Sequence, residues 1–225
     1  MTVTESAPDS HFSVSYRTRN HSGEAADADN SVVIPTDGSA TAVVLNHYTP
    51  TPVSVDLDIA GTKNFIAEGS YPGGKFVYKV QMWDGETWVD ISGKTAETPY
   101  GADESGTKTF VIEDVLAGIA YTEVGNHAYR VVEVKGSVAN VTYDRTLYTF
   151  DVAVTDNGGE LVATVTDLNN TAITDGSYEV TFTNTYHTAP VSIDITKIVD
   201  NRSGDTTVSM AGFVFEAVQT DASWS

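Results

Sequence analysis

The chain has 225 residues, enough for one large domain or two modest ones, and its formal net charge is −19. This acidic balance excludes a nucleic-acid-binding surface, which needs a basic patch to neutralise phosphates. The absence of cysteine excludes disulfides and thiolate metal sites, and no apolar run reaches the length of a membrane span.

The chain begins with MTVTESAPDS, which lacks the basic and apolar regions of a signal peptide. Segments of alternating apolar and polar residues follow, separated by turn sequences such as PGG, DG, NGG and NN. In chain order these segments are VSVDLDI, KFVYKV, HAYRVV, TLYTFDVAV, LVATVT and SYEVTFT. No segment shows a helical repeat of ten or more residues. The pattern predicts an all-β fold of sandwich architecture.

One phrase occurs twice, as VVLNHYTPTPVSVDL at residues 43–57 and as TFTNTYHTAPVSIDI at residues 181–195. Asn46 matches Asn184, at an offset of 138 (184 minus 46). This period is too long for a solenoid repeat and fits a tandem array of sandwich domains. The proline-containing segments TPTP and HTAP read as short, stiff linkers, because proline fixes its own φ and restrains its neighbour.

These linkers divide the chain into three expected parts. Residues 1–48 are predicted to be the C-terminal part of a preceding domain. Residues 49–187 are predicted to form one complete domain, and residues 188–225 to begin a following one. We therefore expect this chain to be a piece of a longer array.

Strand parity places two polar residues on inward faces. In SYEVTFTNTY, Asn184 shares a face with Phe182 and other apolar or aromatic side chains. In VSVDLDIAGTKNF, Lys63 lies between Ile59 and Phe65 on one face. A buried lysine is rare and an unpaired one is costly. Alternatively, the lysine sits at a strand end and reaches water, and the asparagine is a turn residue or a satisfied core amide.

Glu133 gives a weaker signal. It shares parity with Tyr129 and Val131 in HAYRVVEV, but apolar residues also occupy the other face of this segment. An ordinary salt bridge is the alternative interpretation. The flanking parts repeat the three residue types, with Glu5 and Asn46 near the start of the chain and Lys197 near its end.

At these residues the sequence resembles the streptococcal pilin isopeptide-linkage domain of Gram-positive surface proteins. The matching landmarks are GTKNF with Lys63, KFVYKV, HAYRVVEV with Glu133, VTYDRTLYTFDVAV and VTFTNTY with Asn184. Residues 1–48 and 188–225 resemble the second and first halves of sister domains. The resemblance implies tandem immunoglobulin-like β-sandwiches of the inverse type, as in collagen-adhesin B regions and backbone pilins.

The resemblance also implies a spontaneous amide crosslink from Lys63 to Asn184, assisted by Glu133. Burial disfavours charge, so it lowers the pKa of a lysine and raises the pKa of a carboxyl. A neutral Lys63 would then attack the side-chain carbonyl carbon of Asn184, while protonated Glu133 would polarise the carbonyl oxygen. The reaction runs once per molecule, so the protein is not expected to be an enzyme with turnover. It needs no metal and no cofactor.

Two classes of function remain open from the sequence. The first is a structural stalk or shaft module on the cell surface, with neighbouring domains of the same protein and other pilin subunits as partners. The second is an adhesive module that binds a host protein or glycan through its loops. MWDGETWVDISG (residues 82–93) carries two tryptophans around a turn. Exposed rings there would favour binding, and buried rings would favour hairpin packing, which we expect.

Overall fold

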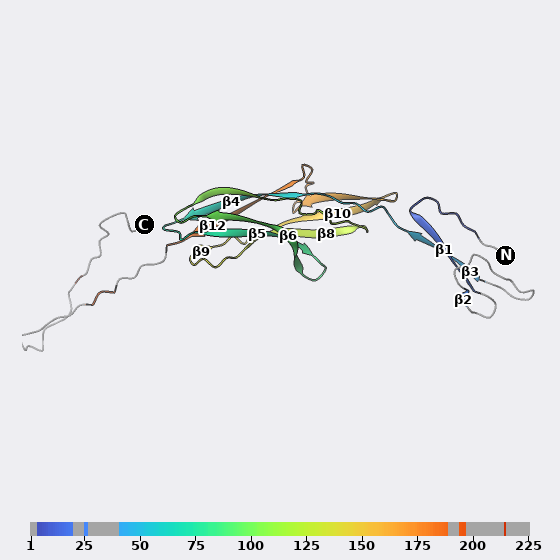
Figure 1. The fold of residues 1–225 in the computed structure, drawn as a ribbon, viewed down its shortest axis with the longest axis horizontal. Helices are drawn as coiled ribbons and strands as arrows, with labels where there is room; N and C mark the ends of the chain where they lie inside the picture. The colour runs from blue at the N-terminus through green and yellow to red at the C-terminus, as the bar shows by residue number, and fades with distance from the viewer. Residues whose placement is uncertain (1–3, 20–24, 27–40, 189–193, 197–213, 215–225) are drawn as a thin grey trace, which may run out of the picture.

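The computed structural model describes residues 4–19, 25–26, 41–188, 194–196 and 214. The elements in this part of the chain are all β-strands, which form three sheets (Figure 1). Nothing in these ranges is a helix long and apolar enough to cross a lipid bilayer.

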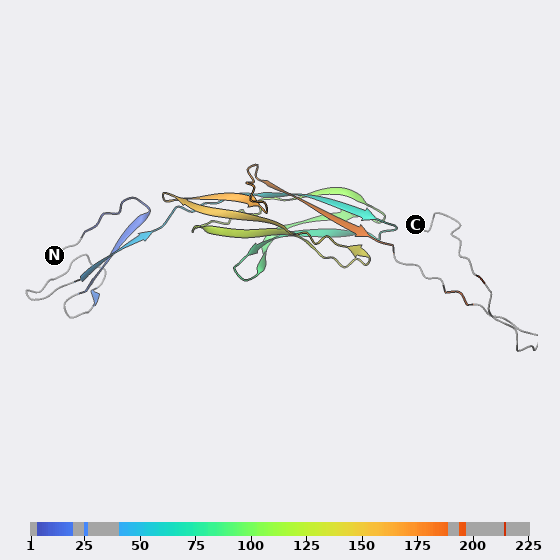
Figure 2. The same cartoon turned by 180° about the vertical axis from the view of Figure 1, so that it is seen from behind.

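Nine strands form the main body, a sandwich of two sheets packed face to face (Figures 1 and 2). They are β4 (Asp58–Ala67), β5 (Gly74–Trp83), β6 (Trp88–Tyr100), β7 (Gly106–Ile112), β8 (Gly125–Val134), β9 (Val141–Thr142), β10 (Tyr148–Asn157), β11 (Glu160–Asp167) and β12 (Ser177–Tyr186). One sheet has the order β11-β10-β8-β5-β6, and the other has the order β7-β4-β12-β9. The fold is therefore the immunoglobulin-like all-β sandwich that the sequence predicts.

The first and last strands of the sandwich, β4 and β12, lie side by side and run parallel. Their register pairs Lys63 with Phe182 and Phe65 with Asn184. Because alternate residues of a strand face the same side, all four side chains project from the same face of this sheet. That face packs on the five-stranded sheet, so the core receives Lys63 and Asn184 together.

Aromatic side chains supply many of the largest groups in the core between the sheets. Phe110 stacks on Tyr78 with ring centroids 3.8 Å apart, and Phe182 stacks on the same tyrosine at 5.3 Å. Gly61 on β4 is buried beneath Phe110, whose ring occupies the space that a Cβ at this position would need. A glycine is therefore required here to let β4 and the Phe110 ring approach each other.

A smaller sheet of order β2-β1-β3 precedes the sandwich, formed by β1 (Phe12–Arg19), β2 (Ala25–Ala26) and β3 (Thr41–Tyr48). The connecting segment is hydrogen-bonded to the turn between β10 and β11. Thr51 N–H donates to the Gly159 carbonyl at 2.7 Å, and its own carbonyl accepts from Leu161 N–H at 3.1 Å. The Tyr48 hydroxyl also donates to the Asp156 carboxylate, near the end of β10.

The segment VSVDLDI begins as a loop and not as the strand that its alternation predicts. β4 starts only at Asp58, which pairs with Ser177, the first residue of β12. Before that point no partner strand runs alongside; the chain instead makes isolated contacts, such as the Leu57 carbonyl accepting from Val115 N–H at 2.8 Å. Leu57 is nevertheless buried, so its apolar character serves the core without a strand.

Candidate functional site: a buried lysine, glutamate and asparagine

Lys63 is fully buried, with 0% of its side chain exposed. It occupies the middle of β4, where buried and partly exposed residues alternate strictly from Asp58 to Phe65. Its Nζ lies 4.5 Å from the centre of the Phe76 ring, which supplies an aromatic wall. A side chain in the middle of a central strand cannot reach water, so the strand-end alternative is wrong for this lysine.

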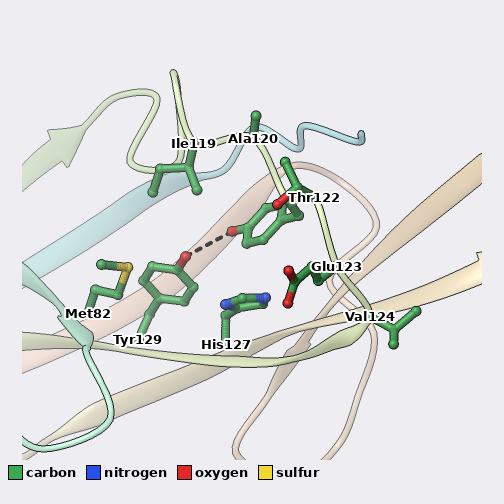
Figure 3. Close-up of a pocket in the computed structure, with 9 residues that line it drawn as sticks. Met82, Ile119, Ala120, Thr122, Glu123, Val124, His127 and Tyr129 are labelled. Carbon is green, nitrogen blue, oxygen red and sulfur yellow. Dashed lines mark hydrogen bonds between the residues drawn. The ribbon is translucent and has the colours of Figure 1, made fainter. Parts of the chain in front are cut away.

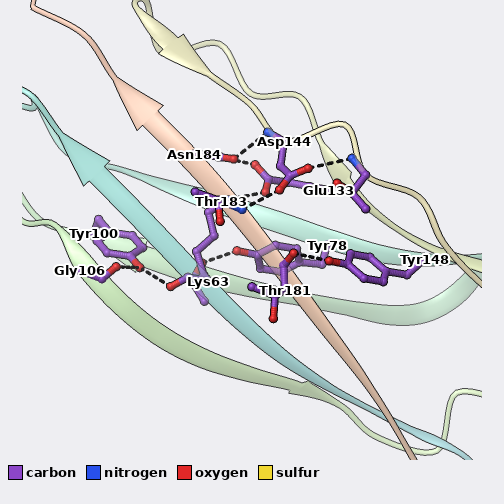
Figure 4. A network of polar contacts seen from close by, with 12 residues as sticks. Lys63, Tyr78, Tyr100, Gly106, Glu133, Asp144, Tyr148, Thr181, Thr183 and Asn184 are labelled. Carbon is purple, nitrogen blue, oxygen red and sulfur yellow. Dashed lines mark hydrogen bonds and ion pairs between the residues drawn. The ribbon is translucent and has the colours of Figure 1, made fainter.

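Glu133 reaches the same point from the opposite sheet. It lies on β8, opposite Tyr78 of β5, and its carboxylate is also 0% exposed. Oε2 of Glu133 lies 2.5 Å from Lys63 Nζ, while Oε1 accepts a hydrogen bond from Asn184 Nδ2 (Figure 4). One carboxylate thus contacts the nitrogen atoms of both other side chains, and the structure brings the three predicted residues together.

Desolvation governs the charges of this group. Burial lowers the pKa of Lys63 below its ordinary value, although its hydrogen bond with Glu133 acts in the opposite sense. Burial likewise raises the pKa of Glu133 above its ordinary value, against the hydrogen bonds from Lys63 and Asn184. Both shifts favour the uncharged forms, a neutral amine beside a protonated carboxyl. An uncharged lysine amine has a free lone pair and can act as a nucleophile.

Asp144 joins the site from the loop between β9 and β10. Its backbone N–H donates a hydrogen bond of 2.7 Å to Asn184 Oδ1 (Figure 4). Because a backbone N–H can only donate, this contact identifies Oδ1 and turns Nδ2 toward Glu133. The arrangement differs from the sequence-based expectation, in which Glu133 contacts the carbonyl oxygen of Asn184.

Sequence reasoning did not single out Asp144, although it lies within the VTYDRTLYTFDVAV landmark. One local signal was available. The Asp144 side chain accepts from Thr146 N–H at 2.8 Å, which is the turn that aspartate makes with the backbone two residues on. That spacing identifies a turn but does not indicate which side chain the backbone of the turn would contact.

The structure describes two of the three site residues predicted in the flanking parts of the chain, Glu5 and Asn46. Asn46 Nδ2 donates to Glu5 Oε1 at 3.1 Å, so a second asparagine and glutamate meet, but both side chains are exposed. Lys197 lies outside the described residues. The described residues also contain no group of three or more His, Cys, Asp or Glu side chains placed to hold a metal ion.

The two tryptophans of the β5–β6 hairpin pack against each other, with ring centroids 5.5 Å apart. The Arg130 guanidinium covers Trp88 at 4.4 Å, and Trp83 keeps 41% of its surface exposed. A separate cavity of about 240 Å³ is lined in part by Met82, His127 and Tyr129 (Figure 3). Neither feature contacts the buried lysine, glutamate and asparagine.

Comparisons with known proteins identify the family of this chain. The family model described as FctA, the Spy0128-like isopeptide containing domain, matches residues 59–187. Among solved structures, the major pilin of Streptococcus pyogenes is 22% identical, with a TM-score of 0.41, over 60% of this chain and 51% of the pilin. The T-13 major pilin of serotype GAS131465 is 19% identical, with a TM-score of 0.39, over 60% of this chain and 53% of the pilin.

The chain thus spans about half the length of the pilins that it matches. No protein with a curated description matches it. The family match covers more than half of the chain and includes Lys63, Glu133 and Asn184. The chain therefore belongs to the family of Spy0128-like isopeptide containing domains, which are structural domains of pilins and not enzymes.

Proposed function

We propose that this chain is a load-bearing shaft or stalk module of a bacterial surface pilin, stapled by a self-formed amide bond between Lys63 and Asn184. The observation that carries the proposal is the fully buried carboxylate of Glu133, which contacts Lys63 Nζ and Asn184 Nδ2 at the same time. A carboxyl placed between the attacking nitrogen and the leaving nitrogen can carry a proton from one to the other.

The bond-forming step balances without any co-reactant. The lone pair of Lys63 Nζ attacks Cγ of Asn184, and the carbonyl electron pair moves to Oδ1. When the carbonyl re-forms, the Cγ–Nδ2 bond breaks and Nδ2 leaves as ammonia. Glu133 accepts a proton from Nζ and supplies one to Nδ2, so the carboxyl ends unchanged. Holding the groups in contact replaces an external catalyst, because good orientation contributes about 7–11 kcal/mol to lowering such a barrier.

The location of the bond suits a module under tension. Tension would enter the sandwich at the start of β4 and leave at the end of β12, because these are its first and last strands. The proposed bond joins the two strands directly, so the pulling force would pass from Lys63 to Asn184 through covalent bonds. Such a staple also withstands the reducing agents that open disulfides, which this cysteine-free chain cannot form.

Intact mass spectrometry of the purified chain tests the proposal. The wild-type chain should be lighter than its sequence by the mass of one ammonia. Lys63→Ala, Asn184→Ala and Glu133→Ala should each restore the full sequence mass, because they remove the nucleophile, the electrophile and the proton carrier. A folded wild-type chain of full sequence mass would refute the crosslink.

The same proposal sets the location and the partners. A shaft module of this family would lie outside the cell, on the surface of a Gram-positive bacterium. Its partners would be the neighbouring domains of the same protein and other pilin subunits. The tryptophans of the β5–β6 hairpin give mixed support to the adhesive alternative, because Trp88 packs beneath Arg130, while Trp83 keeps 41% of its surface exposed.

A further inference from the structure

The crosslinking reaction needs a group that stabilises the negative charge developing on Asn184 Oδ1. We propose that the backbone N–H of Asp144 is this oxyanion donor and that the Asp144 carboxylate is the positioning group that holds it in place. The inference rests on the proposed crosslink and assigns a role that the lysine, glutamate and asparagine do not fill.

The contacts leave this role to Asp144. Both oxygens of the Glu133 carboxylate are occupied by nitrogen atoms, Oε2 by Lys63 Nζ and Oε1 by Asn184 Nδ2. Among the contacts of the described residues, the hydrogen bond to Asn184 Oδ1 comes from Asp144 N–H, at 2.7 Å. This distance is within the range of oxyanion donors in enzymes, where a preorganised N–H in a dry site contributes strongly to catalysis.

The Asp144 side chain fastens that N–H to the strand that carries the electrophile. One carboxylate oxygen accepts from Thr146 N–H at 2.8 Å, which closes the turn. The other accepts at 2.7 Å from Thr183 N–H, in the residue next to Asn184. Partial burial acts to raise the pKa of Asp144, but these hydrogen bonds outweigh it and hold the pKa below the ordinary value. The carboxylate therefore stays charged at neutral pH and keeps both acceptors.

During the reaction, attack by Lys63 Nζ on Cγ moves the carbonyl electron pair onto Oδ1. The Asp144 N–H does not need to move. Its hydrogen bond to Oδ1 becomes stronger as this oxygen becomes negative. When the carbonyl re-forms and ammonia leaves, the same N–H holds the oxygen of the new amide. Glu133 is then needed only for proton transfer between the two nitrogen atoms.

Rates of ammonia loss test this assignment in the full chain. The chain is made in a short pulse of cell-free translation, quenched in denaturant at intervals and weighed by intact mass spectrometry. Asp144→Pro removes the N–H itself and should slow ammonia loss by about 10²–10³-fold. Asp144→Ala leaves the N–H but frees the turn, and should slow it at least about tenfold. Asp144→Asn keeps one acceptor oxygen and should give an intermediate rate.

Asp167→Ala is the matched control. Asp167 is also a turn carboxylate that accepts from the backbone N–H groups of Asn169 and Thr171, but it lies away from the crosslink site. This variant should react at the wild-type rate. Refolding from urea is followed for each variant in a Lys63→Ala background, where no crosslink forms, so that slow folding is not mistaken for slow chemistry.

The outcomes separate the two proposals. A folded Asp144→Ala chain that loses ammonia at the wild-type rate would overturn the positioning role of the Asp144 carboxylate. A folded Asp144→Pro chain that does so would overturn the oxyanion role of the N–H, and either result would leave the crosslink intact. If Asp144→Pro does not fold, the order wild type, Asn, Ala still decides whether the Asp144 turn acts on the reaction. A folded wild-type chain that never loses ammonia would overturn the crosslink and, with it, this inference.

Discussion

At the scale of single residues, the site depends on the exclusion of water from its ionisable groups. The amine of a lysine in water is almost entirely protonated and is therefore not a nucleophile. In this structure Lys63 lies beneath Phe76 and against Glu133, and both ionisable groups are fully buried. The ion pair and the neutral pair differ only in which partner holds one proton across the 2.5 Å contact, and the apolar walls favour the neutral pair.

This shared proton predicts a bell-shaped dependence of the crosslinking rate on pH. Because the pKa of Lys63 is lowered, the rate should fall in acid only when pH drops far enough to protonate the amine beside an already protonated Glu133. Because the pKa of Glu133 is raised, the rate should fall in alkali when the shared proton is lost. Time courses of ammonia loss at a series of pH values measure this profile. A rate that only rises up to the ordinary pKa of lysine would contradict it.

The sequence predicts the burial of some residues of the site better than that of others. Parity alone places Lys63 and Asn184 in the core, because both lie in long strands with strict alternation. Glu133 was ambiguous, since Val132 and Val134 flank it; the structure leaves Val134 exposed and the Glu133 side chain buried. Asp144 was outside the reach of parity, because its contribution comes from a backbone N–H in a loop.

At the scale of elements, β4 must lie close to both of its neighbours. β12 pairs with it along ten residues, and β7 pairs with its other edge. Gly61 allows the Phe110 ring of β7 to lie across β4, and that ring in turn stacks on Tyr78 of the opposite sheet. The sequence indicates that β4 is a strand but does not reveal that its one glycine is covered by an aromatic ring.

Gly61→Ala should therefore destabilise the sandwich by about 1–3 kcal/mol, the usual cost of forcing extra volume into a packed core. The added Cβ would meet Phe110 at 2.0 Å, so the ring must move off Tyr78. Urea unfolding in the Lys63→Ala background measures the loss. Gly125→Ala is the control, since its Cβ would meet nothing closer than His127 at 4.0 Å. Equal stability of the two variants would contradict the packing role of Gly61.

At the scale of the whole molecule, the crosslink would close a loop of 121 residues (184 minus 63). By analogy with a disulfide, closing a loop of this length stabilises the folded state by about 5 kcal/mol. The repeated phrase predicts the two ends of the sandwich, and in the structure β4 begins at Asp58, directly after the first copy of the phrase. The phrase does not predict that these two strands pair with each other. Pairing between strands so far apart in the sequence is decided by packing and not by local sequence.

A Lys63→Met/Glu133→Gln chain should therefore melt roughly 15–25 °C below the wild type. This pair of changes removes the bond without leaving a buried charge unpaired, which would add its own destabilisation. Calorimetry of both chains measures the difference. The Asp167→Ala chain, which retains the crosslink site, should stay much closer to the wild type. Equal melting of the double variant and the wild type would show that the bond contributes nothing to stability.

The parallel pairing of β4 and β12 has a consequence for a damaged molecule. Every loop and hairpin of the sandwich between these strands belongs to the covalent ring that a bond from Lys63 to Asn184 would close. A protease that cuts the chain once anywhere in this ring would open it but release no fragment, because both pieces remain joined at the staple. A filament of such modules would keep its continuity after a single cut in each of them.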